Sequence, residues 1–220
     1  MAGCSSYSLF GSESCCAYDE QDTLHFERTL RAKGYCRVAG IDEAGRGPLA
    51  GPVVAAAVIL PQSFTLPGLT DSKKLSAKKR EHLFHLIRAQ AVAIGTGFAP
   101  AARIDEINIL QATLESMCMA VTALGCEADY LLVDGITPVP LDRPQVCLKQ
   151  GDSRSLSVAA ASIIAKVTRD RMMRAYAHRY PEYGFAGHKG YGTAAHRRLI
   201  AELGPCPLHR TTFGGVKEHV

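Results

Sequence analysis

The sequence predicts an α/β fold in which helices flank a mixed sheet. Five short apolar segments bounded by turn residues predict strands, and longer segments with helical periodicity lie between and after them. The first two strands are joined by a glycine-rich turn, which predicts an antiparallel pair. A chain of 220 residues with 47% hydrophobic and 21% charged residues can bury one substantial core.

The N-terminal half alternates helix and strand signals. Residues 20–34 carry apolar side chains at helical spacing and end at a glycine that suits a helix C-cap. Ser76 is an N-cap candidate before the periodic residues Leu83, Leu86 and Ile87. The expected elements are a helix at 20–34, strands at 35–42 and 51–60, a helix from Ser76 to about residue 90, and a strand at 91–99.

The C-terminal half continues the pattern. The expected elements are a long helix from about residue 101 to 124, strands at 128–135 and from Gln145, a helix at 155–180 that stops before Pro181, and one short helix near 193–203. The long helix is expected to face the core with Ile104, Ile107, Leu110, Leu114, Met117 and Val121. We expect one domain over 19–220, with a small helical C-terminal portion from about residue 182, after a flexible tail at 1–18.

Composition excludes some classes of protein and favours others. No segment approaches the ~20 apolar residues of a membrane span, and the first sixteen residues lack the regions of a secretory signal. The eight cysteines, including Cys15 and Cys16 in the tail, show neither CxxC pairs nor zinc-type spacing. Reduced thiols in a cytoplasmic protein explain them best. A net charge of +4 is compatible with a nucleic-acid partner.

Two adjacent acids, Asp42 and Glu43, end an apolar run directly before the Gly-Arg-Gly turn at 45–47. Ionised neighbours repel, so a cation or a proton between them stabilises the folded state. Glycine lets another backbone approach closely, and arginine binds phosphate through two donors. A metal ion bound between the carboxylates and a substrate phosphate would explain both the adjacent acids and the turn that suits a phosphate. A second pair, Asp105 and Glu106, is explained by the first turns of a helix, where acids meet the helix dipole favourably.

Two further acids lie beside predicted elements: Asp134 ends a strand, and Asp152 precedes a helix. Mg²⁺ prefers oxygen ligands, and two such ions about 3.5–4 Å apart can stabilise phosphoryl transfer. Taken alone, either acid is more often a solvated turn residue or a helix cap. Residue chemistry does not choose between Asp152 and Asp170 as the fourth acid. Asp170, four residues from both Lys166 and Arg174, is expected in an exposed salt-bridge ladder.

Six segments resemble the signature segments of bacterial ribonuclease HII, the type 2 ribonuclease H. They are GIDEAGRGPLAGPVVAAAVIL, DSKKLS, IDEINILQATLESM, LLVDG, GDSRSLSVAAASIIAKVTRDRMM and HKGYGTAAH, in the family's order from about residue 26 to 213. The resemblance implies a ribonuclease H-like fold, with a mixed five-stranded sheet flanked by helices, and a catalytic domain. The first 18 residues have no counterpart in it.

The resemblance also implies an activity. Members cut RNA in RNA/DNA hybrids and nick duplex DNA on the 5′ side of an embedded ribonucleotide, leaving 3′-hydroxyl and 5′-phosphate ends. The residues implied as catalytic ligands of two Mg²⁺ or Mn²⁺ ions are Asp42, Glu43, Asp134 and Asp152, with Asp170 in support. The residues implied in substrate binding are Gly45, Arg46, Gly47, Ser72, Lys73 and Tyr191.

Physical chemistry agrees with these implied roles. A hybrid exposes its 2′-hydroxyls in a wide minor groove, and a bare glycine turn can approach them closely. Tyr191, between two glycines, can lay its ring against a sugar, whereas a buried aromatic role fits its loop-like surroundings less well. Clusters of basic residues can follow the phosphate backbone: Lys73, Lys74, Lys78, Lys79, Arg80, Lys189, Arg197 and Arg198.

Other functions remain open at this point. A metal-dependent DNA junction nuclease of the same fold would also gather carboxylates on a mixed sheet, but would not need the GRG and GYGT segments. A hybrid-binding module without catalysis would not need four acids, and ordinary buried salt bridges explain the clustering beside GRG least well. We expect a monomer without a membrane partner.

Overall fold

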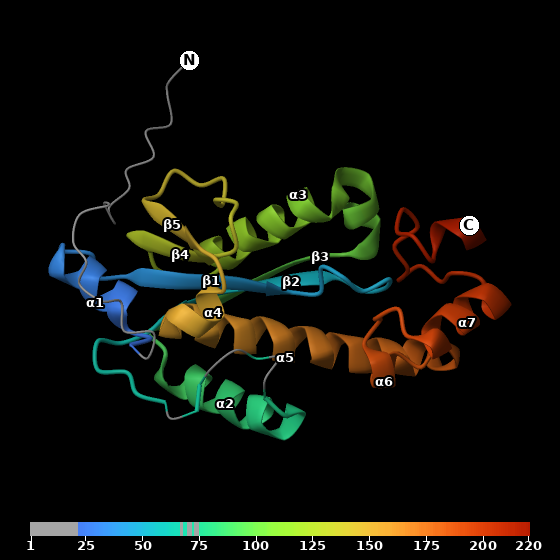
Figure 1. Cartoon of the computed structure of the whole chain (residues 1–220), viewed down its shortest axis with the longest axis horizontal. Helices are drawn as coiled ribbons and strands as arrows, with labels where there is room; N and C mark the ends of the chain where they lie inside the picture. Colours follow the sequence, from blue (N-terminus) through green and yellow to red (C-terminus); the bar gives the residue numbers. More distant parts are fainter. Residues whose placement is uncertain (1–21, 67, 70–71, 73–74) are drawn as a thin grey trace, which may run out of the picture.

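The computed structural model describes residues 22–66, 68–69, 72 and 75–220. It confirms the α/β class and a mixed five-stranded sheet with helices on both faces (Figure 1). The strands are β1 (Val38–Ala44), β2 (Val53–Ile59), β3 (Ala93–Ala99), β4 (Tyr130–Asp134) and β5 (Gln145–Leu148). The tail at 1–18, with Cys15 and Cys16, lies outside the described residues, as does Lys73.

The sheet has the strand order β3-β2-β1-β4-β5. The first three strands pair antiparallel, as the glycine-rich turn between β1 and β2 predicts. Strand β1 pairs parallel with β4, and β4 pairs parallel with β5. The carboxyl ends of β1, β4 and β5 therefore meet at one edge of the sheet, where acids that end these strands lie near each other.

Seven α-helices surround the sheet in the described part of the chain. They are α1 (His25–Ala32), α2 (Ala77–Gln90), α3 (Ala101–Thr122), α4 (Gly151–Arg154), α5 (Leu156–Arg179), α6 (Phe185–His188) and α7 (Ala194–Leu203). Helix α3 covers one face, and α5 covers the other with α2 behind it (Figure 1). Ser76 caps α2 as expected, accepting from the N–H of Lys79. None of the described helices has the length and apolarity to cross a membrane.

Helix α5 lies unusually close to β1. A side chain at Gly40 would collide with the backbone of Ser157 and Val158. Glycine at this position therefore permits the close contact. Because side chains alternate along a strand, Asp42 leaves β1 on the same face as Gly40, the face that α5 covers.

The expected long helix from about residue 101 to 124 is confirmed as α3, but it is broken at one point. Asn108 has φ 68° and ψ 164°, which breaks α3 into two helical segments. Its side-chain oxygen accepts from the N–H groups of Leu110 (2.9 Å) and Gln111 (3.1 Å), so it caps the second segment. The break changes the helical phase. Leu110, expected to face the core, is 37% exposed, while Leu114 and Met117 are buried.

The C-terminal portion contains more helix than expected. Besides α7 it holds α6 and the 3₁₀ turns Pro181–Tyr183 and Lys217–His219. Asp105 lies in the second turn of α3, so its expected place near the start of a helix is confirmed, but it also has partners that the sequence does not indicate. Its carboxylate accepts four hydrogen bonds of 2.6–3.0 Å from the N–H and hydroxyl groups of Thr211 and Thr212. Asp105 thereby anchors the C-terminal segment to α3.

Three histidines, His188, His196 and His209, pack together in this C-terminal portion against Phe185. His196 is fully buried, and burial lowers its pKa to about 4. The unfolded chain would take up this proton at a pH near 6.5. Because the folded state resists protonation, stability is complete above about pH 6.5 and falls as the pH drops toward 4.

We expect the loss from His196 between pH 7 and pH 5 to be about 2 kcal/mol, which corresponds to a Tm lower by about 4–8 °C. Thermal unfolding of the wild type and of His196→Gln at both pH values checks this. His196→Gln should be less stable at pH 7 but lose much less on acidification. Both proteins keep every other titrating group, so equal losses would contradict the buried neutral state of His196.

Candidate active site

Asp42 and Asp134 end adjacent parallel strands. Strands β1 and β4 pair as far as Ile41 and Val133, and the two aspartates are the next residue on each strand. Side chains at equivalent positions of paired strands leave the sheet on the same face. The carboxylate of Asp134 accepts a 2.7 Å hydrogen bond from the N–H of Gly151. The strand pairing thus brings together two acids that are far apart in sequence.

Asp42 is the most constrained of these acids. It is 5% exposed and accepts a 2.7 Å hydrogen bond from the N–H of Glu43. Burial raises the pKa of Asp42 well above its ordinary value, and the charges of Glu43 and Asp134 raise it further. The hydrogen bonds from Glu43 and from the Ser162 hydroxyl oppose these effects. The hydrogen-bond donors around Asp42 therefore do not fully offset the effect of burial and of the neighbouring carboxylates.

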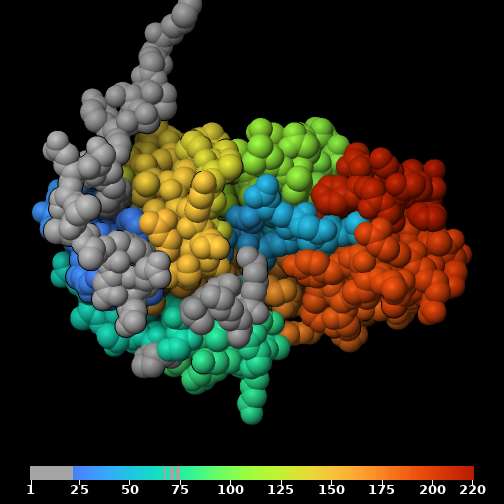
Figure 2. All heavy atoms as spheres, in the orientation of Figure 1, coloured from blue at the N-terminus to red at the C-terminus, as the bar shows by residue number. Residues whose placement is uncertain are grey.

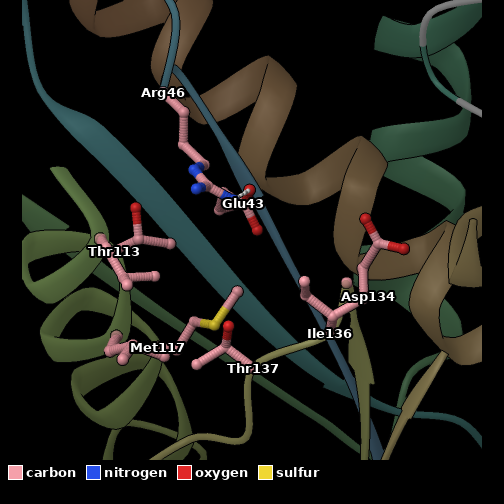
Figure 3. Close-up of a pocket in the computed structure, with 10 residues that line it drawn as sticks. Glu43, Arg46, Thr113, Met117, Asp134, Ile136 and Thr137 are labelled. Carbon is pink, nitrogen blue, oxygen red and sulfur yellow. Dashed lines mark ion pairs between the residues drawn. The ribbon is translucent and has the colours of Figure 1, made fainter. Parts of the chain in front are cut away.

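Glu43 and Arg46 line a cavity of about 320 Å³ on the side of α3. Arg46 Nη1 lies 3.5 Å from Glu43 Oε1 (Figure 3). Asp134 lies at the opposite side of the same cavity, with Gly135, Ile136 and Thr137 after it. The α3 residues in its wall are Leu110, Thr113, Leu114 and Met117. Sequence reasoning missed this wall because it assigned Leu110 to the core.

Asp152 lies in the one-turn helix α4 and is 8% exposed. The expected loop before a long helix is thus already helical. Gln150 enters this turn with a left-handed backbone, φ 54°, and the neighbouring N–H of Gly151 bonds Asp134. This turn places Asp152 one residue from the group that Asp134 binds.

The donor set suits a hard divalent cation, because carboxylate oxygens are the ligands that Mg²⁺ and Mn²⁺ prefer. The unbalanced charge around Asp42 fits the same ion. Within the described ranges, no three acidic, histidine or cysteine side chains are already arranged as a set of metal ligands.

Asp170 is not part of an exposed ladder, so that expectation is wrong. It is 7% exposed and accepts a 2.8 Å hydrogen bond from Lys166 Nζ. The Lys166 ammonium also lies 5.7 Å from the ring centre of Tyr191. The pair therefore connects α5 to the loop that carries Tyr191.

The Gly-Arg-Gly turn contains two glycines with different surroundings. Gly45 has φ +101°, and a side chain there would collide with Arg169 and approach the carbonyl of Pro52. Around Gly47 nothing lies within 4 Å of an added Cβ. The turn lies at the surface of the molecule between α3 and the C-terminal portion (Figure 2). Gly45 is therefore required by the fold, whereas Gly47 leaves open space on the turn.

Two buried arginines stabilise this turn through hydrogen bonds to its carbonyl groups. Arg210 donates to the carbonyls of Gly45 (2.6 Å), Arg46 (2.8 Å) and Gly51 (2.9 and 3.1 Å). Burial, with the nearby charge of Arg169, lowers the pKa of Arg210 to about 9. Because Arg210 binds both ends of the segment 45–51, it fixes the shape of the turn. The sequence pattern singles out neither arginine.

Arg169 joins this turn to the loop that carries Tyr191. It donates to the carbonyls of Ala50 (3.1 Å) and Pro52 (2.9 Å) on one side and of Lys189 (3.0 Å) on the other. The N–H of Leu49 also donates to the carbonyl of Gly190 at 2.8 Å. The Tyr191 side chain is 43% exposed. Turn and loop therefore form one surface.

Ser72 lies apart from that surface. It is 3% exposed, and its hydroxyl oxygen lies 2.8 Å from Ser162 Oγ. Because Ser162 donates its one hydroxyl proton to Asp42, Ser72 is the donor to Ser162. Ser72 is therefore connected to Asp42 through the hydroxyl of Ser162.

Comparison with known proteins gives a consistent result. The family profile described as Ribonuclease HII matches residues 39–216. The chain is 66% identical over 202 residues to the Ribonuclease HII of Syntrophotalea carbinolica, covering 92% of this chain and 97% of that protein. It is 63% identical to the Ribonuclease HII of Geobacter metallireducens, covering 91% and 94%. The crystal structure of ribonuclease H2 from Pyrococcus horikoshii aligns with a TM-score of 0.69 at 27% identity, covering 83% and 96%.

Proposed function

Because the chain belongs to the ribonuclease HII family and is therefore an endoribonuclease of RNA/DNA hybrids, we propose that the acids at one edge of its sheet are its catalytic centre. They are Asp42, Glu43, Asp134 and Asp152. The main support is the environment of Asp42, where burial and two neighbouring carboxylates raise the pKa. Such a site gains most from binding cations. The monomeric state, the cytoplasmic location and the domain limits of the protein stay predictions.

The four carboxylates would hold two Mg²⁺ or Mn²⁺ ions. When bound, these ions supply Lewis-acid activation of the attacking water and charge stabilisation at the leaving oxygen. The residues of this chain keep the ligands in place: Gly151 orients Asp134, and Ser162 with the N–H of Glu43 orients Asp42. We infer cleavage on the 5′ side of a ribonucleotide, leaving a 3′-hydroxyl and a 5′-phosphate.

Substrate binding is assigned to the surface beside these acids. Arg46 would bind a phosphate, and Gly45 and Gly47 would admit the sugar edge with its 2′-hydroxyl. Tyr191 would pack its ring on a neighbouring sugar. Ser72 and Lys73 complete the proposed set. DNA duplexes with embedded ribonucleotides are proposed as substrates on the same grounds as RNA/DNA hybrids.

A labelled DNA duplex with one ribonucleotide tests this function directly. With Mg²⁺ or Mn²⁺ we expect a single cut on the 5′ side of the ribonucleotide, and no cut in the presence of a chelator. An all-DNA junction should stay intact. Cleavage on the 3′ side, metal-independent cleavage or cleavage of the junction would contradict the proposed mechanism.

Tyr191→Ala should raise KM for this duplex by about tenfold, the loss expected for an aromatic ring that packs against a nucleotide. Its Tm should fall only modestly because 43% of Tyr191 is already exposed in the folded protein. Steady-state kinetics of Tyr191→Ala and Tyr191→Phe check this expectation. The matched Phe variant keeps the ring, so a comparable rise of KM in both would argue for a role of the hydroxyl instead.

A further inference from the structure

The histidines of the C-terminal portion form a hydrogen-bonded chain that ends at Tyr191. His209 Nε2 lies 3.0 Å from His196 Nε2, and His196 Nδ1 lies 2.9 Å from the carbonyl oxygen of Tyr191. At its other end, the N–H of Cys206 points at His209 Nδ1 at 2.9 Å. Neither the acids nor the Gly-Arg-Gly turn uses these groups.

The backbone groups at the two ends determine where each proton lies. His209 Nδ1 lies 2.9 Å from the N–H of Cys206 and 3.3 Å from its carbonyl oxygen, and we assign the shorter contact as the hydrogen bond, so that Nδ1 accepts and carries no proton. In neutral His209 the proton is then on Nε2, which donates to His196 Nε2. His196 consequently carries its proton on Nδ1 and donates it to the carbonyl of Tyr191. With both rings neutral, this placement of protons satisfies the contacts of His196 with Tyr191 and with His209.

His188 completes the arrangement from the side. It stacks on His196 with ring centres 4.1 Å apart. Its Nδ1 accepts from the N–H of Gly190 (3.1 Å), so its Nε2 donates to the carbonyl of Tyr183 (2.8 Å). The N–H of Tyr191 in turn donates to the carbonyl of His188 at 2.9 Å. The Tyr191 backbone is thus held at its carbonyl by the His196 ring and at its N–H by the backbone carbonyl of His188.

The surroundings keep these rings neutral. The titratable groups that act on His196 are His188, His209 and Arg197, all of which oppose a further proton. The nearby His188 likewise opposes a further proton on His209, whereas a hydrogen bond with the Cys206 backbone favours one. Burial lowers the pKa of all three histidines.

We propose that His209 and His196 are positioning residues, which orient Tyr191 for substrate through a one-directional relay of neutral imidazoles. This rests on the proposed role of Tyr191 in substrate binding. Without the donor on His209, His196 can move its proton to Nε2. Its Nδ1 lone pair then faces the carbonyl of Tyr191 and repels it. The acids on β1 and β4 are outside the relay, so substrate binding weakens while turnover persists.

The first test measures the tautomers. Full-length protein with ¹⁵N-labelled histidine is studied at pH 7 by long-range ¹H–¹⁵N NMR correlation, without substrate. We expect His196 to be protonated on Nδ1, and His209 and His188 on Nε2. A cationic His196, or one protonated on Nε2, would overturn the relay whatever the substrate role of Tyr191.

The second test is a double-mutant cycle. His209→Leu removes the donor and should raise KM for the ribonucleotide-containing duplex about tenfold, as expected for one lost hydrogen bond, with kcat unchanged within twofold. His209→Gln keeps an N–H near the position of Nε2 and should stay within twofold of the wild type. His85→Leu, at an exposed position on α2, is the matched control and should change neither constant.

In a Tyr191→Ala background the effect of His209→Leu on KM should disappear. An effect that persists there, or that falls on kcat, would overturn the positioning role. If Tyr191→Ala leaves KM unchanged while the tautomers are as expected, the substrate role of Tyr191 fails and the positioning role fails with it. If His209→Leu does not fold, the tautomers in the unaltered protein and the kinetics of His209→Gln still decide the outcome.

Discussion

Asp42→Asn should lower kcat by about 10³-fold, equivalent to about 4 kcal/mol of transition-state stabilisation, and should make the metal-free protein more stable. The first effect follows from losing a charged ligand between Glu43 and Asp134. The second follows because the variant removes a buried carboxylate whose pKa is raised by burial and by both neighbours. We expect Tm without divalent ions to rise by about 2–4 °C.

Single-turnover cleavage and thermal unfolding, each with and without Mg²⁺ or Mn²⁺, measure both effects. Ions that bind the folded state should raise the Tm of the wild type, and the rise should be smaller for Asp42→Asn. Asp142→Asn, an exposed acid in the loop before β5, is the matched control and should keep wild-type behaviour. Near wild-type turnover in Asp42→Asn would refute the assignment of the acids.

Gly45→Ala should destabilise the protein by about 3–5 kcal/mol, combining backbone strain with displaced hydrogen bonds. The backbone at Gly45 has φ +101°, and the added methyl would displace Arg169 from the carbonyls that it binds. We expect Tm to fall by about 10 °C. Because Arg169 also holds the Tyr191 loop, hybrid binding should weaken as well.

Gly47→Ala provides the comparison within the same turn. No atom lies within 4 Å of the added Cβ, so Tm should stay within about 2 °C of the wild type. Any rise of KM in this folded variant then reports contact with substrate. Equal destabilisation of the two variants would contradict the different surroundings of the two glycines.

Much of the fold could be predicted because the burial of apolar side chains determines where apolar residues occur in the sequence. The apolar runs at β1, β2 and β4 and the glycine-rich turn specify the strands and the antiparallel pair directly. The break in α3 was missed, although the sequence carries a signal for it: Asn108 and Gln111 have the spacing of a helix-capping pair. Apolar periodicity across the break concealed that signal.

The site could be predicted in part, for a related reason. Asp42, Glu43 and Asp134 are marked by their place at strand ends, and strand pairing brings Asp42 beside Asp134. The roles of Arg169 and Arg210 depend on carbonyl groups more than a hundred residues away along the chain. Pairings of that kind leave no periodic trace in a single sequence.

The dependence of the turn at 45–51 on Arg210 has a consequence for biosynthesis. A ribosome makes Arg210, which holds the turn, 165 positions after Gly45. Domains fold as their segments emerge, N-terminal parts first. The nascent polypeptide can therefore assemble β1 and β2 well before the turn at 45–51 has its stabilising arginine. The turn reaches its final shape only after residue 210 has been synthesised.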